Sequence, residues 1–188
     1  PLPLRLSRHY SSKATDHSSS MGPGWKHSFD IRVEQMSAAG MRVQTPEQIA
    51  SLAVAHLVIK DLLHHEDSAK GWLLAALTAR WAMDQMTGKD VGIIFPEKSH
   101  LFVAGPDDSY IPPPGSTLSL ILTNGAFRLS ERNGKTYQFN TNGFLSQVED
   151  PHGNTLTFSY TGASNLQTVA SSFGPSLTFS YSEGRLAS

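Results

Sequence analysis

The segment GNTLTFSY at residues 153–160 returns as GPSLTFSY at residues 174–181, at an offset of 21 residues. Leu145, Leu166 and Leu186 mark nearly the same interval one step earlier in each unit. A fixed period of this size is typical of an array of identical supersecondary units. Within each copy, large apolar residues alternate with Thr and Ser, which is the pattern of a strand with one buried face and one face in water. The last third of the chain is therefore predicted to be a repeated β-structure.

Short turn signals separate the strands expected in this region. Asn124-Gly125, Asn133-Gly134 and Asn142-Gly143 follow one another at equal spacing, and Glu183-Gly184 takes the same role later. Asn-Gly is the strongest short signal for a β-hairpin, because a type I′ turn needs positive φ at both central residues. Turns, alternation and residue types agree, so we expect one continuous antiparallel meander over residues 117–188. Its first strands would contain the alternating residues Leu118/Leu120/Leu122, Phe127/Leu129 and Tyr137/Phe139.

Several runs in this part of the chain resemble the Rhs/YD-repeat proteins. The runs are GFL at 143–145, DPHGNTLTFSY at 150–160 and GRL at 184–186. The Tyr-Asp pair after which the repeat is named is replaced here by Tyr160-Thr161 and Tyr181-Ser182, while the strand pattern is kept.

The front of the chain adds to the resemblance. PLRLSRHY at 3–10 and GPGWKHSFD at 22–30 are similar to the segment that opens the repeat region in such proteins, and SYIPPPG at 109–115 is similar to the link into the first repeats. The resemblance implies a hollow β-shell that encloses a variable C-terminal cargo, often a toxin, in secreted or cell-surface bacterial proteins. Its partners would be the rest of its own shell, the cargo domain, and a secretion adaptor or a cell-surface receptor.

The composition narrows the possible functions. The chain has 188 residues, enough for one domain or one domain plus an excursion. The net charge is -1 and the charged fraction is 16%, so the sequence lacks the excess of positive charge that binding to nucleic acid or an anionic membrane requires. The absence of cysteine excludes disulfides, thiolate metal sites and a cysteine nucleophile. Because the chain starts without methionine and stops within the repeat rhythm, we expect it to be a fragment of a longer protein.

We expect two strands in residues 1–36, the first region of the chain. Leu2, Leu4 and Leu6 alternate with polar residues or proline, which favours an edge strand. Residues 11–20 are polar and without period, which predicts a surface loop. Residues 29–33 alternate again and predict a second strand, with Trp25 covering the end of the small sheet.

In residues 37–90 the apolar residues follow helical spacings instead of strand alternation, which predicts an αα-hairpin. Thr45 suits an N-cap and Pro46 the first helical position, and the apolar spacing predicts helices at roughly 46–66 and 68–87. Both helices are apolar on nearly all sides, although neither has the ~20 uninterrupted apolar residues that a membrane span needs. We therefore expect burial against protein, with the hairpin packed across the sheet or plugging the end of the shell.

The remaining boundaries follow from the turns. Residues 91–116 predict a short hairpin and a stiff Pro-rich connector, and residues 117–188 the meander. The expected fold class is thus mainly β with an inserted αα-hairpin.

Histidines are the first candidates for chemistry. His56, His64 and His65 lie near Glu66, but Lys60 between them would repel a cation, and the spacing does not match a zinc site. We read these residues as solvated turn histidines. A pH-sensing role rests only on the residue type.

The sequence evidence for a nucleophilic or acid–base catalytic site is equally weak. No Gly-x-Ser-x-Gly elbow occurs, although a Ser-His-Asp site is a matter of geometry rather than sequence order. Glu149 and Asp150 are adjacent, so on a strand they face opposite ways and make a poor acid–base couple. Gly22-x-Gly24 lacks the context of a phosphate loop.

The run Asp150-Pro151-His152-Gly153 has two interpretations, a self-cleavage motif and a turn. Some Rhs proteins cut themselves at a motif that contains Asp-Pro-x-Gly-Leu, but Asn154 stands here in place of the leucine. Asp-Pro and Gly-Asn are both turn formers, so a turn is the better interpretation.

The aromatic rows have two possible uses. They are Tyr137/Phe139, Phe158/Tyr160 and Phe179/Tyr181. Core packing between neighbouring strands is the better interpretation, and a sugar-stacking platform the alternative. Nucleic acid is disfavoured because no stripe of Lys and Arg accompanies the rings.

The sequence therefore predicts a non-catalytic structural scaffold, secreted or at the cell surface, with no catalytic, cofactor-binding or metal-binding residue. The alternative is a protein- or carbohydrate-binding adhesion module that docks through the apolar hairpin or the aromatic rows. A third hypothesis is a hydrolase that uses His27, Asp30 or the histidine pair.

Overall fold

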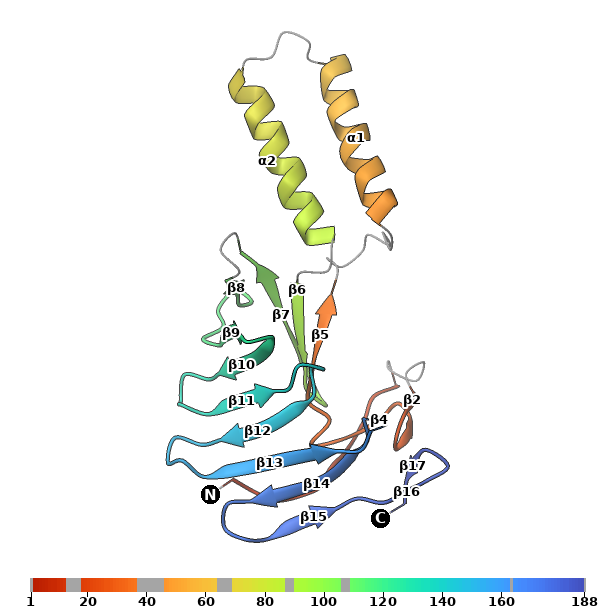
Figure 1. Ribbon diagram of the computed structural model, residues 1–188, viewed down its shortest axis with the longest axis vertical. Coiled ribbons are helices and arrows are strands. Elements are labelled where there is room, and N and C mark those ends of the chain that lie inside the picture. Colours follow the sequence, from red (N-terminus) through yellow and green to blue (C-terminus); the bar gives the residue numbers. More distant parts are fainter. Residues whose placement is uncertain are drawn as a thin grey trace.

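A computed structural model describes residues 2–12, 18–36, 46–63, 69–86, 90–105, 109–162 and 164–187. The chain forms a curved antiparallel sheet from which a helical hairpin extends (Figure 1). The predicted fold class, mainly β with an inserted αα-hairpin, is confirmed.

The main sheet has 11 strands in sequential order from β5 to β15. Each strand pairs antiparallel with the next one along the chain, which is the meander expected from the turns. The strands are β5 (Arg32–Met36), β6 (Asp90–Ile94), β7 (Ser99–Ala104), β8 (Tyr110–Ile111), β9 (Ser119–Thr123), β10 (Ala126–Ser130), β11 (Thr136–Phe139), β12 (Leu145–Glu149), β13 (Thr155–Tyr160), β14 (Leu166–Ser171) and β15 (Ser176–Thr178).

The meander is longer than expected at its start and shorter at its end. Strands β5 to β8 precede residue 117, where the sequence predicts the meander to begin, yet they belong to the same sheet as the repeats. At the other end, β16 (Tyr181–Ser182) and β17 (Arg185–Leu186) form a two-stranded sheet of their own, so the expectation of one continuous meander to residue 188 is wrong there. The amide of Leu186 instead donates to the carbonyl of Ser20, at 2.7 Å, in the N-terminal region.

The Asn-Gly turns are of two kinds. Asn124 and Gly125 both have positive φ, 52° and 77°, in the two-residue connection of a type I′ hairpin. At Gly134 and Gly143 only the glycine has positive φ, and its amide donates to the carbonyl three residues earlier. These are three-residue loops with the glycine in the left-handed position, so the expectation of a type I′ turn at all three sites is wrong.

The sheet curls until its beginning meets its middle. The start of β5 lies against the turn between β11 and β12, where the amide of Val33 donates to the carbonyl of Gly143 at 2.7 Å. The inward face is a continuous apolar core made by one side of each strand. It includes Val91, Ile93, Phe102, Leu129, Leu145, Leu156, Phe158 and Val169.

The N-terminal region covers this core but pairs differently from expectation. Residues 2–6 form no strand; Leu2 and Leu4 pack against the core as an extended cover. The strand is β1 (Arg8–Tyr10), which pairs with β4 (Trp25–His27), and β2 (Ser18–Ser19) pairs with β3 (Gly22–Pro23). Phe29 is buried and lies edge-on to Phe158, with ring centroids 5.7 Å apart.

The helical hairpin consists of α1 (Pro46–Leu63) and α2 (Ala69–Met86). It is inserted between β5 and β6, two strands that pair directly, with Met36 opposite Asp90. Figure 1 shows both helices running away from the end of the sheet, and α2 contacts β7. The expectation that the hairpin packs across the sheet is therefore wrong, because the sheet fills its inner face with its own residues and the N-terminal region.

Candidate functional site

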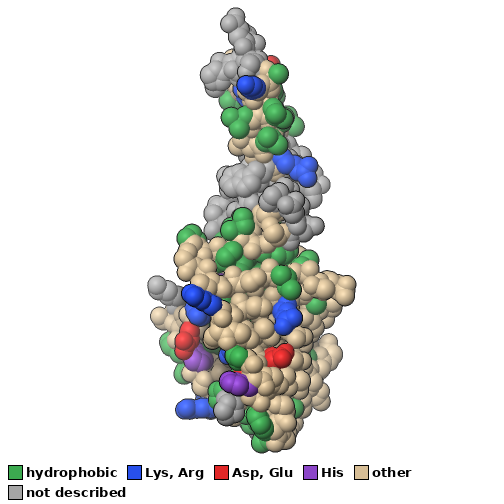
Figure 2. Space-filling model, turned by 90° about the vertical axis from the view of Figure 1, so that its left-hand side faces the viewer, with side chains coloured by type: hydrophobic (Ala, Val, Ile, Leu, Met, Phe, Trp, Pro, Cys, Tyr) green, Lys and Arg blue, Asp and Glu red, His purple; other side chains and the backbone are tan. Residues whose placement is uncertain are grey.

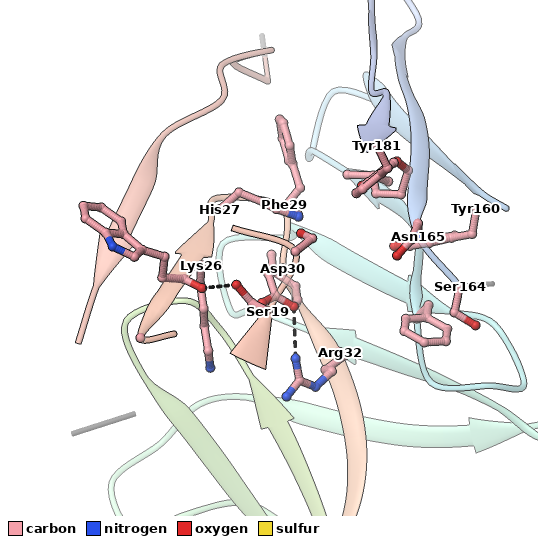
Figure 3. A pocket seen from close by; sticks show the side chains of 16 residues that line it. Ser19, Lys26, His27, Phe29, Asp30, Arg32, Tyr160, Ser164, Asn165 and Tyr181 are labelled. Atoms are coloured by element: carbon pink, nitrogen blue, oxygen red, sulfur yellow. Dashed lines mark hydrogen bonds and ion pairs between the residues drawn. The ribbon is translucent and has the colours of Figure 1, made fainter. Parts of the chain in front are cut away.

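A pocket of about 190 Å³ lies where the N-terminal strands meet the repeat strands. In Figure 3 the side chains of Ser19, His27, Asp30 and Arg32 approach it from the N-terminal side, and Tyr160, Asn165 and Tyr181 from the repeat side. An engineered apolar cavity of about 150 Å³ holds benzene, so this pocket has room for a single ring. Its lining combines aromatic rings with hydrogen-bonding groups.

Arg32 joins the acidic groups at one edge of the pocket. Its Nη1 lies 3.1 Å from Asp30 Oδ1, and its Nε donates to Glu34 Oε1 at 2.6 Å. Burial alone would lower the pKa of Arg32, but the hydrogen bonds and charges of Glu34 and Asp30 raise it above its ordinary value. The Asp30 carboxylate therefore forms an ion pair with Arg32, and this pair lies at the start of β5.

His27 lies at the inner wall of the pocket. Its side chain is 7% exposed and stacks on Phe179 with ring centroids 6.3 Å apart. Its Nδ1 is buried and has no hydrogen-bond partner in the described part of the chain. Burial lowers the pKa of His27, and the nearby Asp30 opposes this shift. The lowered pKa favours the neutral imidazole at neutral pH, and the Nδ1 atom of this ring is left without a partner among the described residues.

Two tyrosines make the same bond one repeat apart. Tyr160 Oη donates to the carbonyl of Leu145, and Tyr181 Oη donates to the carbonyl of Leu166, both at 2.8 Å. Each bond ties one repeat to the preceding one. Burial raises the pKa of Tyr160, and Asp30 raises it further, so its hydroxyl stays protonated.

The pocket does not assemble the hydrolase site considered from the sequence. Ser19 Oγ donates to the carbonyls of Gly22 and Trp25, the latter through a short contact. The Asp30 carboxylate faces Arg32, so it does not orient His27. Nucleophilic catalysis requires a hydroxyl activated by a base such as an imidazole, and no hydroxyl among the described residues that line this pocket makes a hydrogen bond to one. Such a contact occurs outside the pocket, where Ser7 Oγ lies 3.1 Å from His9 Nε2 and His9 Nδ1 lies 2.9 Å from Glu97 Oε1.

The remaining predicted candidates lie apart from the pocket. His64, His65 and Glu66 fall outside the described residues. His56 is exposed on α1, and the Lys60 ammonium lies 5.4 Å from the Trp72 ring centroid. Within the described ranges, no group of three or more His, Asp or Glu side chains is placed to hold a metal ion.

Asp150 acts as a turn residue. Its carboxylate accepts hydrogen bonds from the amides of His152 and Asn154 and from Asn154 Nδ2, at 2.7–2.9 Å. The Asn154 side chain is the main cause that lowers the pKa of Asp150. The turn interpretation of residues 150–153 fits this geometry.

The aromatic rows point into the core. Four of the six rings are buried: Tyr137, Phe139, Phe158 and Phe179. A groove of about 480 Å³ lies between Tyr137 and Phe158 on one side and the N-terminal region, including Leu2 and Phe29, on the other. Phe95 packs edge-on against Tyr137 at 5.5 Å. The rings therefore build the interior rather than an open stacking platform.

The helical hairpin carries an exposed apolar surface (Figure 2). The helices face each other near Ala75, which is buried, and Trp72, which is partly buried. On α1, Val54, Val58 and Leu62 recur every four residues and so share one side of the helix. The outward surface, with exposed fractions of 50–74%, comprises Val54, Val58, Ile59, Leu62, Leu73, Leu74 and Leu77.

Sequence reasoning missed the pocket and the tyrosine bonds. The pocket joins residues 19–32 to residues 160–181, and no local pattern links two such segments. The tyrosine bonds could have been found from the sequence, because Tyr160 and Tyr181 recur at the repeat interval, as do their partners Leu145 and Leu166.

The fold and the site define a class: an antiparallel array of hairpins whose inner face is covered by its own N-terminal region. A domain of unknown function, DUF6531, matches residues 1–50, about a quarter of the chain. No curated protein sequence matches the chain. Of the helices that the structure describes, none has the length and apolar character to cross a membrane.

Proposed function

We propose that this chain is a non-catalytic structural scaffold: the opening segment and first repeats of a β-shell of the Rhs/YD type. The observation that carries the proposal is the strictly sequential sheet, in which each strand pairs with the next one along the chain and the apolar faces form one core beneath the N-terminal cover. Such an array grows by adding hairpins without rearranging earlier ones. The match of DUF6531 to residues 1–50 includes the N-terminal residues that cover the core, such as Leu2, Leu4 and Phe29.

In this proposal the shell encloses a C-terminal, toxin-like cargo in a secreted or surface bacterial protein. The curl of the sheet supports it, because a longer array that continued with the same curl would close around a space.

Electron microscopy of the intact protein that carries this segment tests the proposal. A closed shell whose wall continues the meander beyond β14–β15 is the expected result. An open sheet, or repeats divided among separate domains, would contradict it.

A second candidate function is a docking module, and the outward apolar surface of the hairpin favours it. Patches of several leucines and valines on a monomer mark interaction sites. A variant with Val58, Leu62, Leu73 and Leu77 changed to Glu should lose binding of a hydrophobic dye while keeping the β-sheet circular dichroism signal. Unchanged dye binding would count against docking through this surface.

A further inference from the structure

The chain contains three Asn-Gly pairs whose chemistry the structure makes unequal. Asparagine before glycine is open to an intramolecular reaction, in which the glycine amide nitrogen attacks the asparagine side-chain carbon. Glycine favours the reaction because it has no side chain to block the approach. Asn124, Asn133 and Asn142 are all exposed, so solvent access does not separate them.

At Asn133, hydrogen bonds hold both groups that would react, the Asn133 side-chain amide and the backbone amide of Gly134. Its Nδ2 donates to Glu131 Oε2 at 3.1 Å, and its Oδ1 accepts from the amide of Lys135 at 3.0 Å. The amide of Gly134, which would be the nucleophile, donates to the carbonyl of Glu131 at 3.0 Å. Three hydrogen bonds must therefore break or bend before the nitrogen can reach the carbon.

Asn142 is held by its backbone. The amide of Gly143 donates to the carbonyl of Asn140 at 2.9 Å, and the carbonyl of Gly143 accepts from the amide of Val33 in β5 at 2.7 Å. The space around Gly143 is also full, since a Cβ added there would lie 2.6 Å from the carbonyl oxygen of Val33. Moving the Gly143 nitrogen toward the Asn142 side chain would therefore break its bond to Asn140 and shift Gly143 against Val33.

Asn124 lacks these restraints. It lies with Gly125 in the two-residue turn between β9 and β10, with Thr123 opposite Ala126. In the described part of the chain, neither the Asn124 side chain nor the Gly125 amide makes a hydrogen bond. Around Gly125 there is room, because the nearest atom to an added Cβ would be Thr141 Cγ2 at 3.8 Å.

We propose that Asn124 is a site of spontaneous deamidation, to which Asn133 and Asn142 are resistant while the sheet is folded. The Gly125 nitrogen forms a bond to Cγ of Asn124, the bond from Cγ to the side-chain nitrogen breaks, and ammonia leaves with the amide proton. One water molecule then opens the cyclic imide. Opening at one carbonyl yields aspartate, and opening at the other yields isoaspartate, with no change in oxidation state.

The two products differ in their effect on the fold. Aspartate tolerates the positive φ of this position nearly as well as asparagine does. Isoaspartate adds a methylene group to the main chain, which a two-residue turn cannot hold while Thr123 stays opposite Ala126. The β9–β10 hairpin tip would therefore loosen only in the isoaspartate product.

Peptide mapping by mass spectrometry of the purified chain, aged in mildly alkaline buffer, tests the proposal. We expect Asn124 to convert about tenfold faster or more than Asn133 and Asn142, since their hydrogen bonds must open first. In denaturant the three sites should convert at similar rates. Equal rates in the folded chain, or no conversion at Asn124, would overturn the proposal.

A variant gives the second measurement. Glu131→Ala removes the acceptor of Asn133 Nδ2 and should raise conversion at Asn133 while leaving the rate at Asn124 unchanged. Asn124→Asp gives the aspartate product directly and should keep the fold. Failure of Glu131→Ala to change the rate at Asn133 would show that these side-chain bonds do not control the reaction.

Discussion

His27 connects the N-terminal region to the repeats through its stack on Phe179, and it does so as a neutral group. Because burial makes its pKa lower in the folded protein than the ordinary 6.5, protons bind the unfolded chain more readily. Stability should therefore be insensitive to this group above pH 6.5 and should fall as the pH drops below it. His27→Phe should flatten the decline of the melting temperature between neutral and mildly acidic pH.

The exposed His152 provides the control for that measurement. His152→Gln should leave the acid sensitivity of the wild type in place. An unchanged pH profile in His27→Phe would show that other groups cause the acid sensitivity.

The hydroxyls of Tyr160 and Tyr181 tie successive repeats together. Tyr160→Phe and Tyr181→Phe each remove one hydrogen bond and keep the ring, so each should cost about 0.5–1.5 kcal/mol in the free energy of unfolding. Denaturant titration measures this loss. Tyr10→Phe, at an exposed ring against Trp25, should cost nothing measurable.

At the scale of elements, two turns allow a matched comparison. Gly143 and Gly153 have nearly the same φ, 82° and 79°, so alanine is strained by about 1–2 kcal/mol at either position. Only at Gly143 would the new Cβ meet the carbonyl oxygen of Val33, whereas no atom lies within 4 Å at Gly153. Gly143→Ala should be less stable than Gly153→Ala by about a further 1–3 kcal/mol, measured by denaturant titration. Equal losses would mean that β5 does not press on this turn.

The helical hairpin is an insertion between two neighbouring strands of the sheet, and we expect the sheet to fold without it. β5 and β6 pair directly, with Met36 opposite Asp90, so a two-residue Asn-Gly turn can replace residues 37–89. The shortened chain should unfold at the same temperature as the full chain or slightly above it, because a shorter loop costs less closure entropy. Calorimetry measures the transition, and a collapse of the sheet would show that α1 and α2 support it.

At the scale of the whole molecule, the N-terminal cover holds the curled sheet closed. Phe29 is 8% exposed and packs on Phe158, far away in sequence. Phe29→Ala should cost about 3–5 kcal/mol and expose the inner face to a hydrophobic dye. Phe173→Ala, at a ring that is 63% exposed, should have little effect on either measurement.

The periodic part of the fold was predictable because its causes are local. The alternation in residues 153–160 and 174–181, the glycines at the turns and the start of α1 at Pro46 all act on neighbouring residues. The curl, the cover and the pocket could not be predicted, because contacts such as Val33–Gly143 and Phe29–Phe158 join distant segments that share no pattern.

By itself, the sequence determined the class of the fold: strands that alternate between a buried and a wet face, reversed at glycine turns, with an apolar helical hairpin between two of them. Only the tertiary structure decided which strands share one sheet, which Asn-Gly turn remains open to reaction and where the helices point. The physical reason is that strand periodicity and turn chemistry act within a few residues, whereas closure of the sheet depends on side chains that meet after the chain has folded.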